Sequence, residues 1–168
     1  TDVASGGIYA IEYDGYGENV TVANGGAFAL HGTVRNLTLA KDAAYYFDLG
    51  TAVFQGNLDC YLDPSELETL NEILMFSELD SLTLRIEASQ FGQDEYKAFS
   101  TENNEDIDYR FVLVLENGKT VTLREDSHYW YNGECYSLSY DAYDYQYSLN
   151  KFTQEKTHTL VTGSSNID

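Results

Sequence analysis

Alternation of apolar and polar residues along the chain predicts a protein built mainly from β-strands. The clearest run lies between Ser81 and Ala88, where apolar residues occupy every second position: Leu82, Leu84, Ile86 and Ala88. A period of two places these side chains on one face, which is the pattern of a half-buried strand. We expect this strand to join the antiparallel sheet described next.

The dipeptide Asn117-Gly118 predicts a first β-hairpin between two β-prone runs. Asn-Gly suits a two-residue type I′ turn, because both central residues of that turn take positive φ. Such a turn pairs Val112 with Leu123 and Val114 with Val121. These four side chains then form one apolar face of the hairpin.

A second Asn-Gly dipeptide, Asn132-Gly133, predicts another hairpin directly afterwards. The same turn geometry pairs Trp130 with Cys135 and Tyr129 with Tyr136. Cross-strand pairs of this kind contribute roughly 0.2–1 kcal/mol each. We expect the two hairpins to form a four-stranded antiparallel meander.

The sequence Asp63-Pro64-Ser65-Glu66 has the features of a helix start. Asp63 can cap the helix, Pro64 suits its first position, and Glu66 completes a capping-box arrangement. We expect a helix from Pro64 to about Phe76, packed on the sheet through an apolar stripe of Leu67, Leu70, Ile73 and Leu74.

The first 62 residues contain short β-like runs and a faint internal repeat. Asn19–Ala23 (Asn-Val-Thr-Val-Ala) recurs as Asn36–Ala40 (Asn-Leu-Thr-Leu-Ala), and a third Asn-Leu occurs at Asn57-Leu58. Each of the first two copies precedes an apolar run that ends in Gly-Thr, at Gly32-Thr33 and Gly50-Thr51. A recurring unit of this length is compatible with adjacent turns of a small β-solenoid.

This repeat resembles the coils of polymer-forming β-solenoids such as bactofilins, and no catalytic or binding motif accompanies the resemblance. A solenoid normally needs at least three repeats to be stable. We therefore favour the alternative, an ordinary antiparallel meander whose turns echo one another.

Together these features predict an α+β fold that is predominantly β. We expect a β-rich N-terminal segment over residues 1–62, a meander or small solenoid. One helix packed on an antiparallel sheet built from the two Asn-Gly hairpins follows over residues 63–152, and a C-terminal tail over residues 153–168. The order of helix and sheet is similar to that of small secreted inhibitor and PepSY-like modules. A single compact domain is the alternative division.

The charge excludes several classes of partner. Nine Lys and Arg against 28 Asp and Glu give a net charge of −19, which repels nucleic acid and anionic membranes. No run approaches the length of a membrane-spanning helix. The acidic, Tyr-rich and β-prone composition is typical of exported proteins, so we expect a bacterial protein that is extracellular or in the cell envelope. Its export signal or lipid anchor would lie outside this sequence.

Two cysteines, Cys60 and Cys135, are the only ones in the chain. They are compatible with one disulfide, which would close a long loop and stabilise the fold by up to ~4 kcal/mol. They are equally compatible with two buried free thiols that pack as small apolar groups.

Candidate catalytic and metal-binding chemistry is sparse. His31, His128 and His158 lie in separate segments without the spacing of a metal site. Motifs for nucleophilic catalysis or phosphate binding are absent from the sequence. Acidic residues at 102–108, and the pair Asp141 and Asp144, supply oxygen ligands that suit Ca²⁺, although they lack the fixed spacing of a dedicated loop.

Tyrosines are the most distinctive candidates for a surface function. The candidate ligand-binding residues are Tyr129, Tyr131, Tyr136, Tyr143, Tyr145 and Tyr147. Tyrosine suits recognition of protein or carbohydrate, since a large apolar ring ends in a polar group. Half-buried rings that cover a sheet edge are the simpler interpretation. We predict a non-catalytic binding module, with two alternatives: a carboxylate-dependent glycoside hydrolase, and a structural or assembly protein that acts through the N-terminal repeat.

Overall fold

A computed structural model of the protein describes residues 1–74, 77–92, 95–101, 106–125, 127–153 and 164–166. The chain divides into two compact units. Unit 1 comprises Thr1–Leu62, Thr69–Arg85 and Asp106–Arg110, and unit 2 comprises Asp63–Glu68, Ile86–Glu105 and Phe111–Asp168.

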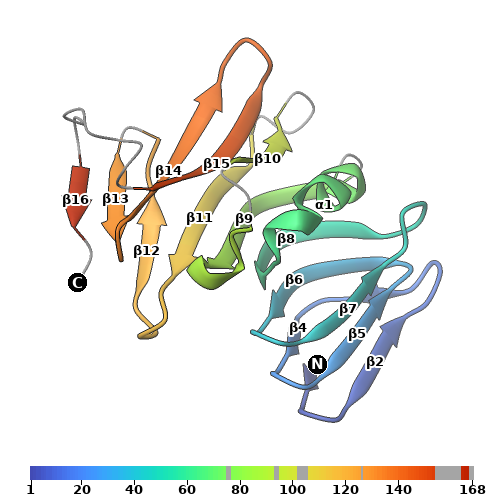
Figure 1. Cartoon of the computed structure of the whole chain (residues 1–168). Helices are drawn as coiled ribbons and strands as arrows, with labels where there is room; N and C mark the ends of the chain where they lie inside the picture. Colours follow the sequence, from blue (N-terminus) through green and yellow to red (C-terminus); the bar gives the residue numbers. More distant parts are fainter. Residues whose placement is uncertain (75–76, 93–94, 102–105, 126, 154–163, 167–168) are drawn as a thin grey trace. The chain divides into compact units, whose positions relative to one another are not determined.

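The elements follow one another along the chain as short strands with few helical turns (Figure 1). The first half contains β1 (Asp2–Val3), β2 (Ile8–Ile11), β3 (Tyr16–Gly17), β4 (Val20–Val22), β5 (Ala27–Leu30), β6 (Thr33–Leu39), β7 (Ala44–Phe47) and β8 (Val53–Tyr61). A 3₁₀ turn, η1 (Pro64–Glu66), then leads into α1 (Leu67–Leu74) and β9 (Glu78–Glu87). The second half contains the 3₁₀ turn η2 (Ala88–Gln90), β10 (Glu95–Ser100), β11 (Asp108–Val114), β12 (Thr120–Leu123), β13 (His128–Tyr131), β14 (Glu134–Asp141), β15 (Gln146–Thr153) and β16 (Ser164–Asn166).

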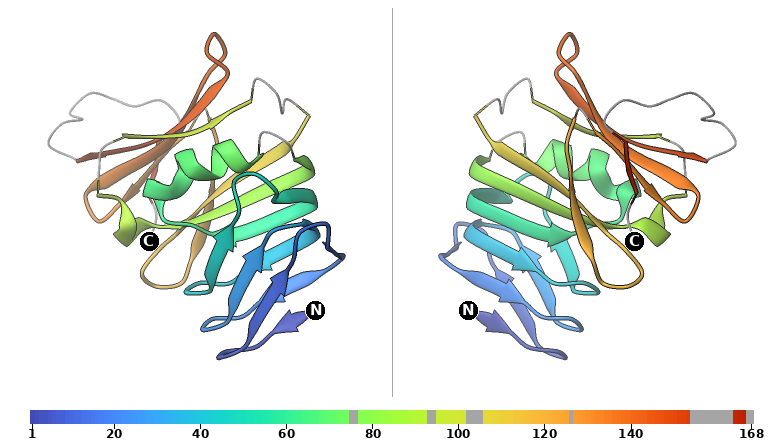
Figure 2. Two further views of the ribbon diagram at one scale, coloured as in Figure 1. Left: turned by 90° about the vertical axis from the view of Figure 1, so that its right-hand side faces the viewer. Right: turned by 90° about the vertical axis from the view of Figure 1, so that its left-hand side faces the viewer.

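Unit 1 is a β-solenoid of stacked parallel strands. One wall has the strand order β1-β4-β6-β8-β9, with β3 also paired to β6, and the other wall has the order β2-β5-β7. All of these pairs are parallel. Figure 2 shows the strands of successive coils lying above one another. The repeat in the sequence therefore marks solenoid coils, and the antiparallel meander favoured from the sequence is wrong.

The core of unit 1 consists of ladders of apolar side chains. Residues that share a ladder come from successive coils and are in register: Val20 with Leu37, Leu58 and Leu82, and Val22 with Leu39, Cys60 and Leu84. The second wall adds a ladder of Ile11, Leu30 and Phe47. All of these residues are buried. Each fully buried Val, Leu or Phe side chain contributes about 1.5–3 kcal/mol.

An asparagine ladder connects the coils at the repeated Asn positions. The Asn36 amide donates to Oδ1 of Asn19 (3.0 Å), and the backbone N–H and amide of Asn57 donate to Oδ1 of Asn36 (3.0 and 3.1 Å). The Ser81 hydroxyl continues the ladder by donating to Oδ1 of Asn57. Asn36 has φ of +56° and Gly56 has φ of +65°. These left-handed residues bend the strands where the β6–β8 and β8–β9 registers shift.

The predicted helix begins where the sequence indicated. The Asp63 side chain accepts a hydrogen bond from the Ser65 backbone N–H (2.9 Å), and Pro64 opens the first turn. The α-helix that follows has only eight residues, and its Leu67 and Leu74 are buried. It lies in the connection between β8 and β9, two parallel strands, which need a long crossover.

The predicted fold class is wrong. The protein is nearly all β and solenoid-like, and the arrangement of one helix packed on a hairpin sheet is not seen. The two hairpins also belong to different sheets: β11 pairs with β12, whereas β13 and β14 lie in the sheet β10-β15-β14-β13-β16. Parallel pairing joins segments that are distant in the sequence and leaves no local turn signal, so the pattern alone did not reveal it.

The second predicted hairpin is confirmed in its register. Trp130 pairs with Cys135 and Tyr129 pairs with Tyr136. Asn132 and Gly133 have φ of +50° and +77°, as a type I′ turn requires.

The first predicted hairpin exists, but its predicted register is wrong by one residue. Phe111 pairs with Leu123, and Leu113 pairs with Val121. Only Gly118 of the turn has positive φ (+83°), and the Asn117 side chain accepts a hydrogen bond from the Lys119 N–H (2.9 Å). The loop therefore has three residues and ends in a left-handed glycine, which exchanges the two faces relative to a two-residue turn.

Two further strands of unit 2 lie in segments that the sequence did not assign to strands. β10 pairs with β15. β16 lies within the segment predicted as a tail and pairs with β13 in parallel.

Candidate functional site

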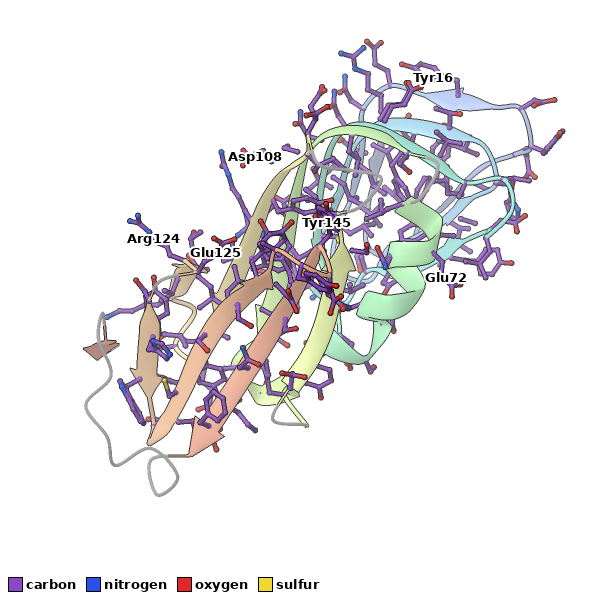
Figure 3. The ribbon with its side chains drawn as sticks, turned by 90° about the horizontal axis from the view of Figure 1, so that it is seen from above. Tyr16, Glu72, Asp108, Arg124, Glu125 and Tyr145 are labelled. Atoms are coloured by element: carbon purple, nitrogen blue, oxygen red, sulfur yellow. The ribbon has the colours of Figure 1, made fainter. Side chains whose placement is uncertain are left out.

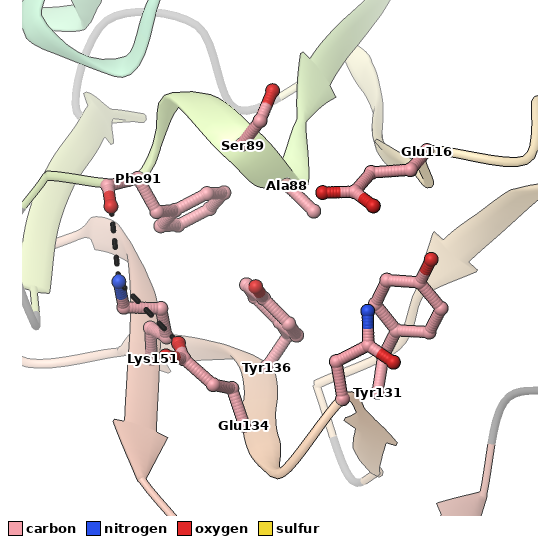
Figure 4. Close-up of a pocket in the computed structure, with 9 residues that line it drawn as sticks. Ala88, Ser89, Phe91, Glu116, Tyr131, Glu134, Tyr136 and Lys151 are labelled. Atoms are coloured by element: carbon pink, nitrogen blue, oxygen red, sulfur yellow. Dashed lines mark hydrogen bonds and ion pairs between the residues drawn. The ribbon is translucent and has the colours of Figure 1, made fainter.

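Unit 2 contains an open pocket of about 240 Å³. Its lining comes from η2, from the β11–β12 turn and from strands β13, β14 and β15 (Figure 4). The lining residues are Ala88, Ser89, Phe91, Glu116, Tyr131, Asn132, Glu134, Tyr136 and Lys151. The type I′ turn at Asn132-Gly133 positions Tyr131 and Glu134 on the two strands of one hairpin.

One side of the pocket holds a half-buried ammonium group. The Lys151 side chain is only 17% exposed, and its Nζ donates to the Phe91 carbonyl oxygen (2.9 Å). The same Nζ lies 3.4 Å from Oε2 of Glu134. Oε2 has no hydrogen-bond partner among the described residues, so the contact is an ion pair without a well-formed hydrogen bond. A buried cation needs such partners, because removing it from water is costly.

Glu116 faces this ion pair from the other side of the pocket. Its carboxylate extends from the β11–β12 turn toward the space that Tyr136 and Tyr131 also border (Figure 4). Two carboxylates and one ammonium give the lining a formal charge of −1. The pocket therefore combines excess negative charge with aromatic walls.

Burial and nearby negative charge both act on the hydroxyl of Tyr136. Burial raises the pKa of Tyr136 to about 12, and the charges of Glu134, Tyr131 and Glu116 add to the effect. A negative neighbour disfavours the phenolate, so the hydroxyl stays protonated at neutral pH. It can therefore donate a hydrogen bond as well as accept one.

Ring packing fixes the aromatic wall. The Phe91 ring contacts Tyr136 and Tyr96 edge-on, with centroid distances of 5.3 and 5.7 Å. The Tyr96 hydroxyl accepts a hydrogen bond from the Gly92 N–H (2.9 Å), which holds the chain after Phe91. Edge-to-face pairs of this kind are worth about 0.5–1.5 kcal/mol beyond the area they bury.

The structure places the six predicted tyrosines in two groups. Tyr131 and Tyr136 line the pocket, and Tyr129 lies beside them on β13, with its hydroxyl 3.4 Å from the Thr122 carbonyl oxygen. The other three lie at or after the β14–β15 turn: Tyr143, Tyr145 and Tyr147.

Within that second group the three rings have different environments. Tyr143 is 91% exposed and Tyr145 is 41% exposed, and Tyr145 has φ of +54°. The Tyr147 ring packs on Tyr140 (4.6 Å) and on Phe111 (5.2 Å). The turn places them in a hairpin rather than on one extended strand.

Sequence reasoning missed the charged and apolar partners of the pocket: Phe91, Glu116 and Lys151. No motif marks Lys151, and Glu116 is one of 28 acidic residues. The only available signal was the second hairpin, whose register correctly places Tyr131 and Glu134 across from each other.

The remaining candidates do not form a site among the described residues. Cys60 and Cys135 are free thiols buried in different units, and burial raises the pKa of Cys60 to about 12. His31 Nδ1 lies 3.3 Å from Asp48, and His128 Nδ1 is buried without a partner in the described part of the chain. His158 lies outside the described residues.

The described residues contain no group of three or more His, Cys, Asp or Glu side chains that could hold a metal. Asp141, a predicted calcium ligand, instead accepts hydrogen bonds from the N–H groups of Tyr143 (2.9 Å) and Asp144 (3.2 Å) in the β14–β15 turn. Residues 102–105 of the other acidic cluster lie outside the described residues.

None of the three comparisons with known proteins found a similar protein: no family model, no curated protein and no solved structure matches this chain. Among the described residues, no helix has the length and apolar character needed to cross a membrane.

Proposed function

We propose that the protein is a non-catalytic, exported or cell-surface binding module, and that the pocket of unit 2 receives a cationic side chain of a protein partner. The observation that carries this proposal is that Glu116, Glu134 and Tyr136 line the same pocket. A lysine or arginine side chain entering the pocket would meet carboxylate acceptors and a tyrosine wall together.

The ammonium group of Lys151 does not use all of the negative charge of the pocket, so a cation from a ligand can also bind there. Lys151 is engaged by the Phe91 carbonyl and by Glu134, so it offsets one of the two carboxylates. Glu116 has no ion pair with any described residue, and its charge is available to a ligand. The half-buried Tyr131 ring adds to this preference, because a cation near a ring face gains about 0.5–2 kcal/mol.

The long-range field favours the same ligand. A net charge of −19 attracts cations and raises their rate of encounter. Sugar recognition usually uses broad ring faces, yet Tyr136 is only 5% exposed and Phe91 only 6%. A cationic protein side chain therefore suits the pocket better than a glycan.

Capped tripeptides test the proposal directly. Peptides with lysine, arginine, norleucine or glutamate at the central position would be titrated into the ¹⁵N-labelled protein and followed by NMR. We expect the lysine and arginine peptides to shift amide resonances of residues 88–91, 116 and 131–136, and the norleucine and glutamate peptides to leave them unchanged. Equal shifts with norleucine would contradict a cation site.

A charge-matched pair of variants locates the interaction. Glu116→Gln removes the pocket carboxylate, whereas Glu125→Gln removes one from the exposed β12–β13 connection, where Figure 3 shows Arg124 and Glu125. We expect about tenfold weaker binding for Glu116→Gln and a change within about twofold for Glu125→Gln. Equal losses of affinity in the two variants would indicate that the peptide responds only to the net negative charge of the protein. Shifts produced by methyl glycosides at the same residues would favour a glycan instead.

The second candidate is a carboxylate-dependent glycoside hydrolase. It is favoured by one observation, namely that Glu116 and Glu134 line the same pocket, as the acid and base of such an enzyme must. Hydrolysis of a panel of nitrophenyl glycosides that is lost in both Glu116→Gln and Glu134→Gln would establish this candidate. Absence of turnover across the panel would exclude it for those sugars.

A further inference from the structure

The outer surface of the solenoid wall β2-β5-β7 is apolar. Its strands are in register, so Ile8 aligns with Ala27 and Ala44, and Ala10 aligns with Ala29 and Tyr46. The alternate residues of these strands form the inner side, where Ile11, Phe28, Leu30 and Phe47 are buried. We call the six outer residues the apolar face: Ile8, Ala10, Ala27, Ala29, Ala44 and Tyr46.

Described residues leave this face open to solvent. Ile8 is 85% exposed and Tyr46 is 57% exposed, Ala10 and Ala44 are exposed as well, and Ala27 and Ala29 of the central strand are half-buried. The face carries no charged side chain, and its only polar side-chain group is the Tyr46 hydroxyl. Contiguous exposed apolar residues of this kind mark interaction sites more often than isolated ones.

The other wall of the same solenoid shows that a polar surface is compatible with this fold. Its outer residues at equivalent positions are Asp2, Thr21, Thr38, Asp59 and Thr83. Arg85 adds a bidentate ion pair to Asp59, with distances of 2.8 and 3.1 Å. The apolar face is therefore a property of one wall rather than a requirement of the coil.

Two carboxylates and a histidine between them border the apolar face at one end of the strands. The ladder continues one residue further, through hydrogen bonds from His31 N–H to the Ile11 carbonyl (2.8 Å) and from Asp48 N–H to the Leu30 carbonyl (2.9 Å). This extension aligns Glu12, His31 and Asp48. His31 lies between the two carboxylates, and its Nδ1 is 3.3 Å from Asp48. At the opposite strand ends, Lys41 and Asp42 offset one another in charge.

The size and charge of the face argue against a second copy of the chain as its partner. Three strands of four residues cover roughly 10 by 13 Å, whereas a stable dimer buries about 800 Å² on each subunit. Two copies that each carry −19 also repel one another. A smaller partner of opposite charge is the complementary one.

We infer that the apolar face is a docking site for a cationic amphipathic segment of another protein. Apolar side chains of the segment would lie on the alanine rows, between Ile8 and Tyr46 at opposite corners of the face. Lysine or arginine residues at its edge would pair with Glu12 and Asp48. This site lies in unit 1 and is independent of the pocket in unit 2.

Two synthetic peptides test the inference. One is an amphipathic helix of leucine and lysine of about four turns, and the other has glutamate in place of lysine. Isothermal titration of each into the full chain should give saturable binding for the lysine peptide and none for the glutamate peptide. Binding of both with similar affinity would overturn the charge argument.

Matched substitutions place the peptide on the apolar face. Ala29→Gln puts a polar side chain at its centre, and Thr38→Gln makes the corresponding change on the polar wall. We expect Ala29→Gln to weaken binding by about tenfold or more and Thr38→Gln to change it by less than about twofold. Thermal melts confirm that both variants fold. Unchanged affinity in Ala29→Gln would overturn the inference, even if the peptide still bound elsewhere.

Three further measurements distinguish a peptide site on the apolar face from binding in the pocket, self-association and lipid binding. The loss of affinity caused by Ala29→Gln should be the same in a Glu116→Gln background. If Glu116→Gln alone abolished peptide binding, the peptide would be assigned to the pocket of unit 2. Analytical ultracentrifugation of the protein alone should show a monomer. A dimer that is lost in Ala29→Gln would mean that the apolar face binds a second copy of the chain, and it would overturn the inference. The protein should not cosediment with phosphatidylcholine vesicles. Cosedimentation that is lost in Ala29→Gln would assign the apolar face to lipid and would also overturn the inference.

Discussion

The two units build β-structure from opposite kinds of pairing. In unit 1, Val20 pairs with Leu37 on the next coil, so every pair joins residues separated by a complete turn of the solenoid. In unit 2, Trp130 pairs with Cys135 across one tight turn. Local pairing depends on the turn residues themselves, whereas stacked pairing depends on corners that keep successive coils in register.

The largest expected difference lies at the corners of unit 1. A Cβ added to Gly32 would lie 2.5 Å from the carbonyl oxygens of both Glu12 and Gly15, which belong to the preceding coil. Backbone atoms cannot move aside as a flexible side chain can. We expect Gly32→Ala to lower the free energy of unfolding by about 2–3 kcal/mol, measured by urea denaturation followed by circular dichroism.

Gly50→Ala is the control, because Gly50 begins the second Gly-Thr dipeptide and lies in the connection between β7 and β8. A Cβ there meets nothing within 4 Å. We expect a change within about 0.5 kcal/mol, with a small gain from reduced backbone freedom in the unfolded chain. Similar losses for both variants would show that the corners are not the tight points of the stack.

The next comparison concerns asparagines with positive φ in the two units. Asn36→Gly keeps the left-handed backbone of the ladder but removes the side chain that accepts from Asn57 and donates to Asn19. We expect the free energy of unfolding to fall by about 1–2 kcal/mol. Asn132→Gly makes the same change in the hairpin turn and should alter it by less than about 0.5 kcal/mol. Equal effects would mean that the ladder adds nothing to the turn geometry.

Different parts of the fold were predictable for different physical reasons. The second hairpin was correct to the residue, because Asn132 and Gly133 both suit positive φ and leave one register. The first hairpin contains the same dipeptide, yet the Asx turn of Asn117 adds one residue to its loop. The dipeptide indicates that a hairpin exists and does not by itself fix the loop length.

The solenoid was visible in the sequence only as a faint repeat of Asn19, Asn36 and Asn57. Coil lengths grow along unit 1, because Val20 pairs with Leu37 but Leu58 pairs with Leu82. Such drift weakens any fixed period. The candidate pocket was harder still: Glu116, Phe91 and Lys151 come from segments that only the tertiary fold brings together.

The smallest predicted effect is the pH dependence of stability that arises from Tyr136 in the pocket. The pKa of Tyr136 is raised from 10.0 to about 12 by burial and by neighbouring negative charge. The folded state therefore holds this proton more tightly than the unfolded state. Stability from this group is complete below about pH 10 and is lost as the pH rises through 12.

Tyr136→Phe removes this titration, whereas Tyr131→Phe removes the hydroxyl of its neighbour in the pocket. Urea denaturation at about pH 8 and pH 11 gives the loss of stability for each protein. We expect Tyr136→Phe to lose about 1 kcal/mol less than the wild type over this interval, since a tenfold difference in protonation corresponds to about 1.4 kcal/mol. Tyr131→Phe should stay close to the wild type, because burial, the main cause of the raised pKa of Tyr136, remains. If Tyr136→Phe also followed the wild type, burial and the neighbouring charges would not raise the pKa of this hydroxyl in the folded state.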